Sequence, residues 1–159
     1  MSLGQKIVGM HYRYPDYYVV EREKIREYAT AVKNDDRFFF GEDEAAKLGY
    51  SALPVPPTFT SVLGYKAQLA FFHDAGIGLM EAKIVHVDQV LKFLGPIRAG
   101  DKLYCDVYVE SVRAAHSAEL IVNKVIISNQ EGDIVQETYT TLAGRAGEDG
   151  GEGFSDGGA

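Results

Sequence analysis

The chain has 159 residues, of which 46% are hydrophobic and 25% are charged, and its formal net charge is -7. That length fits one domain with a sizeable buried core. The negative charge argues against nucleic acid as a partner, because phosphate binding needs clustered Lys and Arg. The single cysteine, Cys105, cannot form an internal disulfide, and the N-terminal segment holds no long apolar run. We therefore expect no membrane span and a cytoplasmic location.

The first half of the chain has the pattern of a short strand followed by helices. Residues 17–20 are aromatic and β-branched, and apolar residues then recur at helical spacing over 21–33. A short helix is predicted over 42–48, with Gly49 as its terminating residue. Residues 57–74 are apolar or small on nearly every face, which is typical of a buried helix.

The second half has the pattern of strands. Residues 83–93 and 102–112 alternate between polar and apolar side chains, and residues 120–128 are β-branched and apolar. Residues 129–133 form a hairpin turn, after which residues 134–142 return as a strand rich in Thr and Tyr. Antiparallel strands around one buried helix predict an α+β hot-dog fold, in which the sheet wraps around a long central helix. Another α+β sandwich, with a helix on one face, is the alternative.

The C-terminal residues differ in composition from the rest. Residues 147–159 are rich in glycine and acidic residues, and Phe154 is their only large apolar side chain. Such a segment cannot bury enough surface to offset the entropy of ordering it. We expect a single domain over residues 1–146 and a tail over 147–159 without fixed structure.

One short motif resembles a known family. Residues 93–103 read FLGPIRAGDKL, which is similar to the F-x-x-P-x-x-x-G-D-x-L motif of hot-dog hydratases and dehydratases. Pro96 would end one strand because it has no N–H, and Gly100-Asp101 would make the turn into the next. The motif follows a predicted buried helix that Pro57-Thr58-Phe59 opens, and this order strengthens the resemblance.

Over residues 7–144 the chain resembles the HadA-type subunit of mycobacterial (3R)-hydroxyacyl-acyl carrier protein dehydratase, in the MaoC-like, R-specific hydratase family. The segments that carry this resemblance are residues 22–29, 57–59, 87–89, 100–103, 131–133 and 139–144. The resemblance implies a lyase of type II fatty acid synthesis that makes mycolic acid precursors without a cofactor. It implies a HadB-type catalytic partner subunit and a long-chain 3-hydroxyacyl thioester bound to acyl carrier protein as substrate.

The catalytic groups of that family are replaced in this chain. Dehydration needs an acid, a base and donors for the thioester oxygen. In that family these groups belong to an Asp-x-Asn-Pro-x-His loop and to a His-Gly pair that follows it at the start of the buried helix. Aligning that pattern places Asn34 at the Asp position, Phe39 at the His position and Pro57 at the Gly position. Phe39 cannot accept a proton and Pro57 has no N–H to donate, so we expect no catalytic residue in this chain.

A subunit without catalytic groups would contribute a channel for the acyl chain. The residues expected to line it, for their small size or their place beside the helix, are Thr58, Ser61, Val62, Gly64, Tyr65, Ala67 and His86. Plain core packing is the alternative role for most of them. The Asp, Glu and His residues show no metal-ligand spacing, so no metal is expected.

Two other functions compete with the subunit hypothesis. One is a stand-alone hot-dog hydratase or thioesterase that uses groups such as Asp35 and His86. The other is a homodimeric hot-dog protein that binds acyl thioesters without catalysis. Activity of the purified single chain would distinguish a stand-alone enzyme from a heterodimer subunit. Co-purification with a second subunit would distinguish a heterodimer subunit from a homodimeric binding protein.

Overall fold

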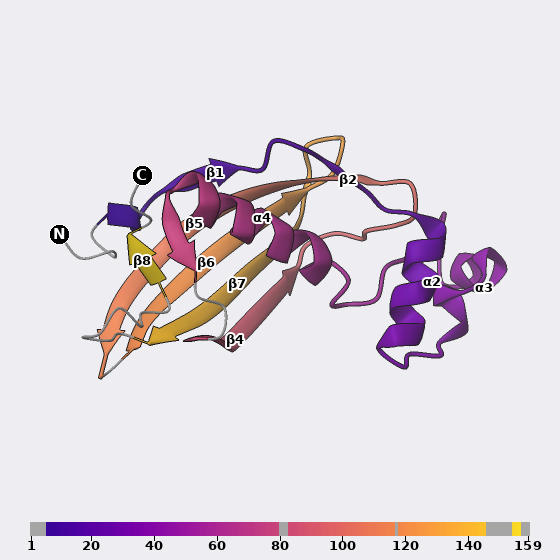
Figure 1. Ribbon diagram of the computed structural model, residues 1–159. Helices are drawn as coiled ribbons and strands as arrows, with labels where there is room; N and C mark the ends of the chain where they lie inside the picture. The colour runs from indigo at the N-terminus through magenta and orange to yellow at the C-terminus, as the bar shows by residue number, and fades with distance from the viewer. Residues whose placement is uncertain (1–5, 80–82, 117, 146–153, 157–159) are drawn as a thin grey trace.

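An antiparallel sheet in the order β1-β5-β6-β7-β4 forms the body of the molecule, with β2 also paired to β5. The computed structural model describes residues 6–79, 83–116, 118–145 and 154–156. Their main strands are β4 (Ile84–Phe93), β5 (Lys102–Ala115), β6 (Ala118–Ser128) and β7 (Ile134–Arg145), and the N-terminal strands are β1 (His11–Arg13) and β2 (Tyr18–Val19). Helix α4 (Ser61–Asp74) lies along one face of this sheet (Figure 1). The predicted hot-dog arrangement is confirmed.

The core lies between α4 and the sheet. On β5 the alternate residues Leu103, Cys105, Val107 and Val109 are all buried, as their period-two spacing predicts. On β6 the inward face is formed by Ile121, Asn123, Val125 and Ile127. Leu63, Ala67 and Phe71 face them from α4 and are equally buried. This packing fixes which side of α4 faces the sheet.

One polar contact crosses this apolar interface. The buried Asn123 side chain donates from Nδ2 to Oε1 of Gln68, at 3.1 Å. Gln68 in turn donates from Nε2 to the carbonyl of Gly64, one helical turn earlier, at 3.3 Å. The contact satisfies both side-chain amide groups in part, and the Oδ1 atom of Asn123 has no hydrogen bond within the described chain.

Helix α4 begins later than the sequence predicts. Residues 57–60 form turns, in which Phe59 N donates to Pro56 O and Ser61 N donates to Thr58 O. The first bond of α-helical spacing runs from Gly64 N to Thr60 O. The helix is also less enclosed than predicted, since Tyr65 is 59% exposed.

The other predicted helices lie together beyond one end of the sheet (Figure 1). They are α2 (Arg22–Ala31) and α3 (Glu42–Lys47), with a short 3-10 helix, η1 (Arg37–Phe39), between them. Gly49 follows α3 with a φ of 86°, a conformation that suits glycine. An ion pair between Arg22 and Glu42 joins α2 to α3.

The C-terminal prediction needs correction at three residues. Phe154–Asp156 form strand β8, which pairs antiparallel with β3 (Ile77–Leu79). The reason is Phe154, whose ring is 4% exposed and therefore gains by ordering the strand that carries it. The other residues of the predicted tail, 147–153 and 157–159, lie outside the described residues.

Candidate functional site

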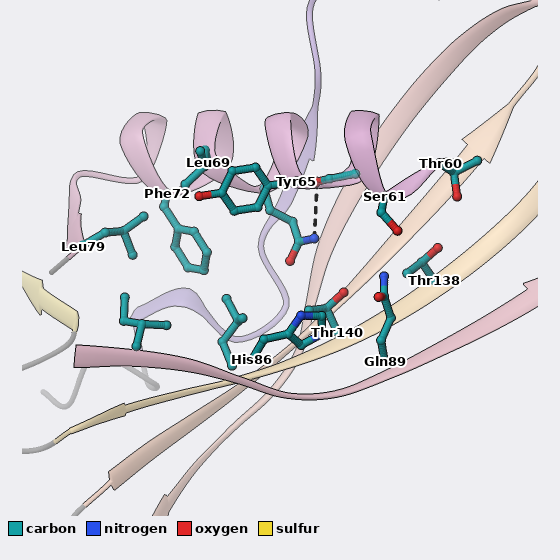
Figure 2. A pocket seen from close by; sticks show the side chains of 14 residues that line it. Thr60, Ser61, Tyr65, Leu69, Phe72, Leu79, His86, Gln89, Thr138 and Thr140 are labelled. Carbon is teal, nitrogen blue, oxygen red and sulfur yellow. Dashed lines mark hydrogen bonds between the residues drawn. The ribbon is translucent and has the colours of Figure 1, made fainter. Parts of the chain in front are cut away.

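A cavity of about 370 Å³ lies between α4 and the strands β4 and β7 (Figure 2). We call it the α4 cavity. Its volume falls within the range of small-molecule sites. The residues that line it are Thr60, Ser61, Gly64, Tyr65, Gln68, Leu69, Phe72, Leu79, Ile84, His86, Gln89, Thr138, Thr140 and Leu142.

The two ends of the α4 cavity differ in polarity (Figure 2). Hydroxyl and amide groups gather at the end where α4 begins, from Thr60, Ser61, Thr138 and Gln89. Phe72 and Leu79 lie at the opposite end. Because polar groups are distributed in this way, the cavity suits an elongated ligand with a polar head and an apolar tail.

Two of the polar groups in this cavity have unmet hydrogen-bonding capacity. Thr60 and Thr140 are 3% and 4% exposed, and their hydroxyl oxygens make no hydrogen bond to the described residues. A buried hydroxyl without a partner costs free energy comparable to a lost hydrogen bond. Each of these oxygens is itself shielded from solvent, so both belong to the cavity wall without being open to a ligand in this arrangement.

A β-bulge at Val87 decides which polar residue of β4 reaches the cavity. The register pairs His86 with Leu142, then Asp88 with Thr141 and Gln89 with Thr140. Strict alternation would place Asp88 on the same face as His86. The bulge shifts the parity by one residue, so the neutral amide of Gln89 lines the cavity and the Asp88 carboxylate does not.

The α4 cavity consequently lacks a carboxylate among its described lining residues. Its titratable side chains are those of Tyr65 and His86. His86 donates from Nε2 to the backbone carbonyl of Asp88, at 3.1 Å. An acid and a base in the same site are what dehydration of a hydroxyacyl thioester requires. The described walls supply an imidazole without a carboxylate beside it.

The residues predicted to line a substrate channel divide into two groups. Ser61, Gly64, Tyr65 and His86 line the α4 cavity. The other three, Thr58, Val62 and Ala67, do not.

The structure corrects the placement of those three for simple reasons. Thr58 precedes the helix, and its hydroxyl and carbonyl oxygens lie 2.8 and 2.9 Å from the phenolic oxygen of Tyr28 on α2. Ala67 is fully buried in the core, so its small size serves close packing against the sheet. Val62 lies one residue after Ser61 and points to a different side of α4.

The three positions that the sequence analysis aligned with family catalytic groups lie outside the α4 cavity. Phe39 is 4% exposed and packs on Phe38, with ring centroids 4.3 Å apart. The Oδ1 atom of Asn34 accepts a hydrogen bond from the backbone N–H of Asp36 and so shapes the loop after α2. Pro57 borders a second hollow, together with Pro56 and the buried Gln136.

Asp35 is exposed in the loop before η1, whereas His86 lies on β4 and lines the α4 cavity. Asp35 lines neither of the two described cavities. The structure does not bring these two candidate groups into one site. Only His86 is positioned to meet a ligand there.

The described part of the chain contains no group of three or more His, Cys, Asp or Glu residues arranged to hold a metal ion. None of its helices has the length and hydropathy needed to cross a membrane. Burial raises the pKa of the Cys105 thiol to about 12. That thiol is therefore a packing group and not a nucleophile at neutral pH.

The polar lining from β7 and from the core was missed by the sequence analysis. Thr138 and Thr140 are buried at alternate positions of β7, and Gln68 is the one polar side chain on the buried face of α4. The alternation of Thr in Thr138-Tyr139-Thr140 was a usable signal, since inward-facing Thr on a strand marks a polar patch in a core. Gln89 could not be found in this way because the bulge at Val87 changes its side.

Comparison with known proteins agrees with this fold. Residues 6–138 match the family described as FAS1-like, dehydratase domain region. A UPF0336 protein of Mycobacterium tuberculosis is 70% identical over 159 residues, which is 100% of both chains. A chain of the C-terminally truncated HadBC (3R-hydroxyacyl-ACP dehydratase) complex from Mycobacterium tuberculosis is 44% identical, with a TM-score of 0.80 over 87% of this chain and 97% of that chain.

A solved MaoC-like dehydratase is 32% identical, with a TM-score of 0.81 over 89% of this chain and 43% of that chain. The fold and these similarities therefore define a hot-dog protein of the MaoC-like class. Within that class, the chain belongs to the FAS1-like dehydratase domain family.

Proposed function

We propose that this chain is the acyl-binding subunit of a heterodimeric (3R)-hydroxyacyl thioester dehydratase, whose partner subunit supplies the catalytic acid and base. The observation that carries the proposal is the α4 cavity, which is polar at one end, apolar at the other, and without a carboxylate among its described lining residues. Its shape and polarity match a long acyl thioester, and its chemistry lacks half of what dehydration needs.

The replaced positions support a non-catalytic role. A buried phenylalanine at Phe39 can neither donate nor accept a proton. Pro57 removes the backbone N–H that would stabilise the thioester oxygen as charge develops on it, and such a donor is worth ~3 kcal/mol of barrier. With these groups absent, the α-proton and the leaving hydroxyl of the substrate must be handled by residues of another chain.

An unpaired sheet edge supports a partner subunit. Strand β4 is ten residues long and pairs with β7 on one side, and the described chain places no strand on its other side. Its exposed side chains include Val85, Val87 and Val90, which are 62%, 57% and 45% exposed. A long apolar edge of this kind favours pairing with another chain. The cavity lies directly behind β4, so a partner seated on this edge would reach the bound thioester.

The HadBC complex, which consists of two different dehydratase subunits, supports a HadB-type partner of the same family. Fatty acid elongation by the type II synthase, with long-chain 3-hydroxyacyl groups on acyl carrier protein as substrates and mycolic acid precursors as products, is the pathway that fits such a pair. We propose the cytoplasm as its location.

The test is hydration of a trans-2-enoyl thioester by three preparations. These are the purified chain, a tagged relative that carries the Asp-x-Asn-Pro-x-His loop, and the two chains expressed together and purified through the tag. We expect no detectable turnover by the isolated chain and strong turnover of long substrates by the pair. Robust turnover by the isolated chain, or equal turnover of long substrates by the pair and by the relative alone, would refute the proposal.

A further inference from the structure

The floor of the α4 cavity is a row of alternate residues on β7 that stops at Gly144. Thr138, Thr140 and Leu142 line the cavity in turn. Side chains two residues apart on a strand share a face, so the next position in the row is Gly144. Gly144 provides no side chain there, and the cavity nevertheless does not extend over it.

The space above Gly144 is filled by the ring of Phe154. A Cβ atom at Gly144 would lie 2.2 Å from Cδ2 and 2.4 Å from Cε2 of that ring, which no real structure tolerates. Phe154 therefore requires glycine at this position of β7. The ring occupies the place that the side chain of residue 144 would otherwise take.

Several contacts hold Phe154 against the apolar end of the cavity. In the pairing of β8 with β3, Phe154 lies opposite Leu79, and its ring centroid is 6.0 Å from that of Phe72. Leu79 and Phe72 both line the cavity, as does Ile84, which pairs with Gly144 in the sheet. Phe154 is 4% exposed. It thus backs the apolar end wall from behind and closes the row along β7.

We propose that Phe154 is the end stop of the α4 cavity and sets the longest acyl chain that the cavity can hold. This inference rests on the function proposed above and deepens it, because it assigns chain-length specificity to a residue of the C-terminal strand. A methyl end that reaches Leu142 can go no further without displacing the ring, since packed interiors leave no spare volume. Without the ring, the cavity would continue over Gly144.

The test is equilibrium binding of saturated acyl-pantetheine thioesters that lengthen by two carbons per step. For the full-length wild-type chain, affinity should rise roughly fourfold for each added methylene that is buried, and then stop rising. In Phe154→Ala the rise should continue for further steps before it stops. Phe38→Ala, which removes a half-buried ring that does not line the cavity, is the matched control. Its affinity should stop rising at the same acyl length as that of the wild type.

A second variant tests the same idea through the floor. In Gly144→Ala the new Cβ excludes the ring from its present position, so the affinity should again continue to rise beyond the wild-type length. The inference is overturned if the affinities of wild type and Phe154→Ala stop rising at the same acyl length, and the proposed function then still stands. If no thioester of any length binds the wild-type chain, the acyl-binding function itself is refuted and the inference with it.

Discussion

Two substitutions at Gly64 should separate the stability of the chain from its binding of ligand. Gly64 lies in the first turn of α4, where its N–H donates to the carbonyl of Thr60. It lines the cavity, and a Cβ built there would meet no neighbouring side chain within 4 Å. Glycine in a helix interior is about 1 kcal/mol less favourable than alanine. Gly64→Ala should therefore raise the free energy of unfolding by about 1 kcal/mol, which corresponds to roughly 3 °C in the midpoint of thermal unfolding for a chain of this size.

Gly64→Leu keeps a strong helix former at this position but fills part of the cavity, within one helical turn of its polar end. If about three methylenes of a long acyl chain are kept out, at about 0.8 kcal/mol each, binding weakens by about 2.4 kcal/mol, or roughly fifty-fold. A short chain that ends before Gly64 should lose only a few-fold in affinity.

The assay is differential scanning calorimetry of the three proteins, followed by isothermal titration with a short and a long acyl-pantetheine thioester. The calorimetry should show that Gly64→Leu is folded, so that a selective loss of long-chain binding cannot arise from unfolding. Equal loss for both lengths would show that the acyl chain does not pass Gly64, and a lower unfolding midpoint for Gly64→Ala would show that the cavity beside it is not open.

Three further predictions concern single side chains. His86→Gln should leave hydration by the two-subunit enzyme within a few-fold of wild type, and a hundred-fold loss in the steady-state rate would instead make His86 a catalytic residue. The hydrogen bond from Arg22 lowers the pKa of Glu42 from 4.5 to about 2, so the contribution of this pair to stability is complete above pH 4.5 and is lost as the pH falls towards 2. The midpoint of thermal unfolding of Glu42→Gln should accordingly change less with pH over that window than the midpoint of wild type does. An equal pH dependence in the two proteins would show that the ion pair does not contribute to stability. Since burial raises the pKa of Cys105 to about 12, iodoacetamide should label it only in denaturant, and rapid labelling of the native chain would contradict its burial.

Much of the fold could be predicted from the sequence because its local signals agree with the tertiary structure. The alternation on β5 and the glycine after α3 each follow from a local rule that packing does not override. Strand β8 could not be predicted in this way. Composition of the tail argues for disorder, and the burial site of Phe154 is created by a glycine on a strand that lies earlier in the chain.

The candidate site was predictable only where the position of a residue along its own helix or strand decides the outcome. Gly64 and His86 line the cavity as expected, whereas the sequence could not show that Ala67 is packed into the core. The bulge at Val87 is the clearest limit. Alternation along β4 predicts a histidine and an aspartate side by side in the cavity, and one inserted residue replaces that pair with a histidine and an amide.

The hydrogen bond between Gln68 and Asn123 has a consequence for how α4 is seated. A helix that is apolar on most of its faces could rotate or slide on an apolar sheet at little cost, because dispersion and burial have no direction. An amide pair in the middle of that contact has one favourable arrangement. Any other leaves the Asn123 Nδ2 donor and the Gln68 Oε1 acceptor buried without their partner, at about 1–3 kcal/mol each. The pair thus fixes the orientation of α4 on the sheet. It selects the rotation of the helix about its axis at which Gly64 faces the cavity and Ala67 faces the core.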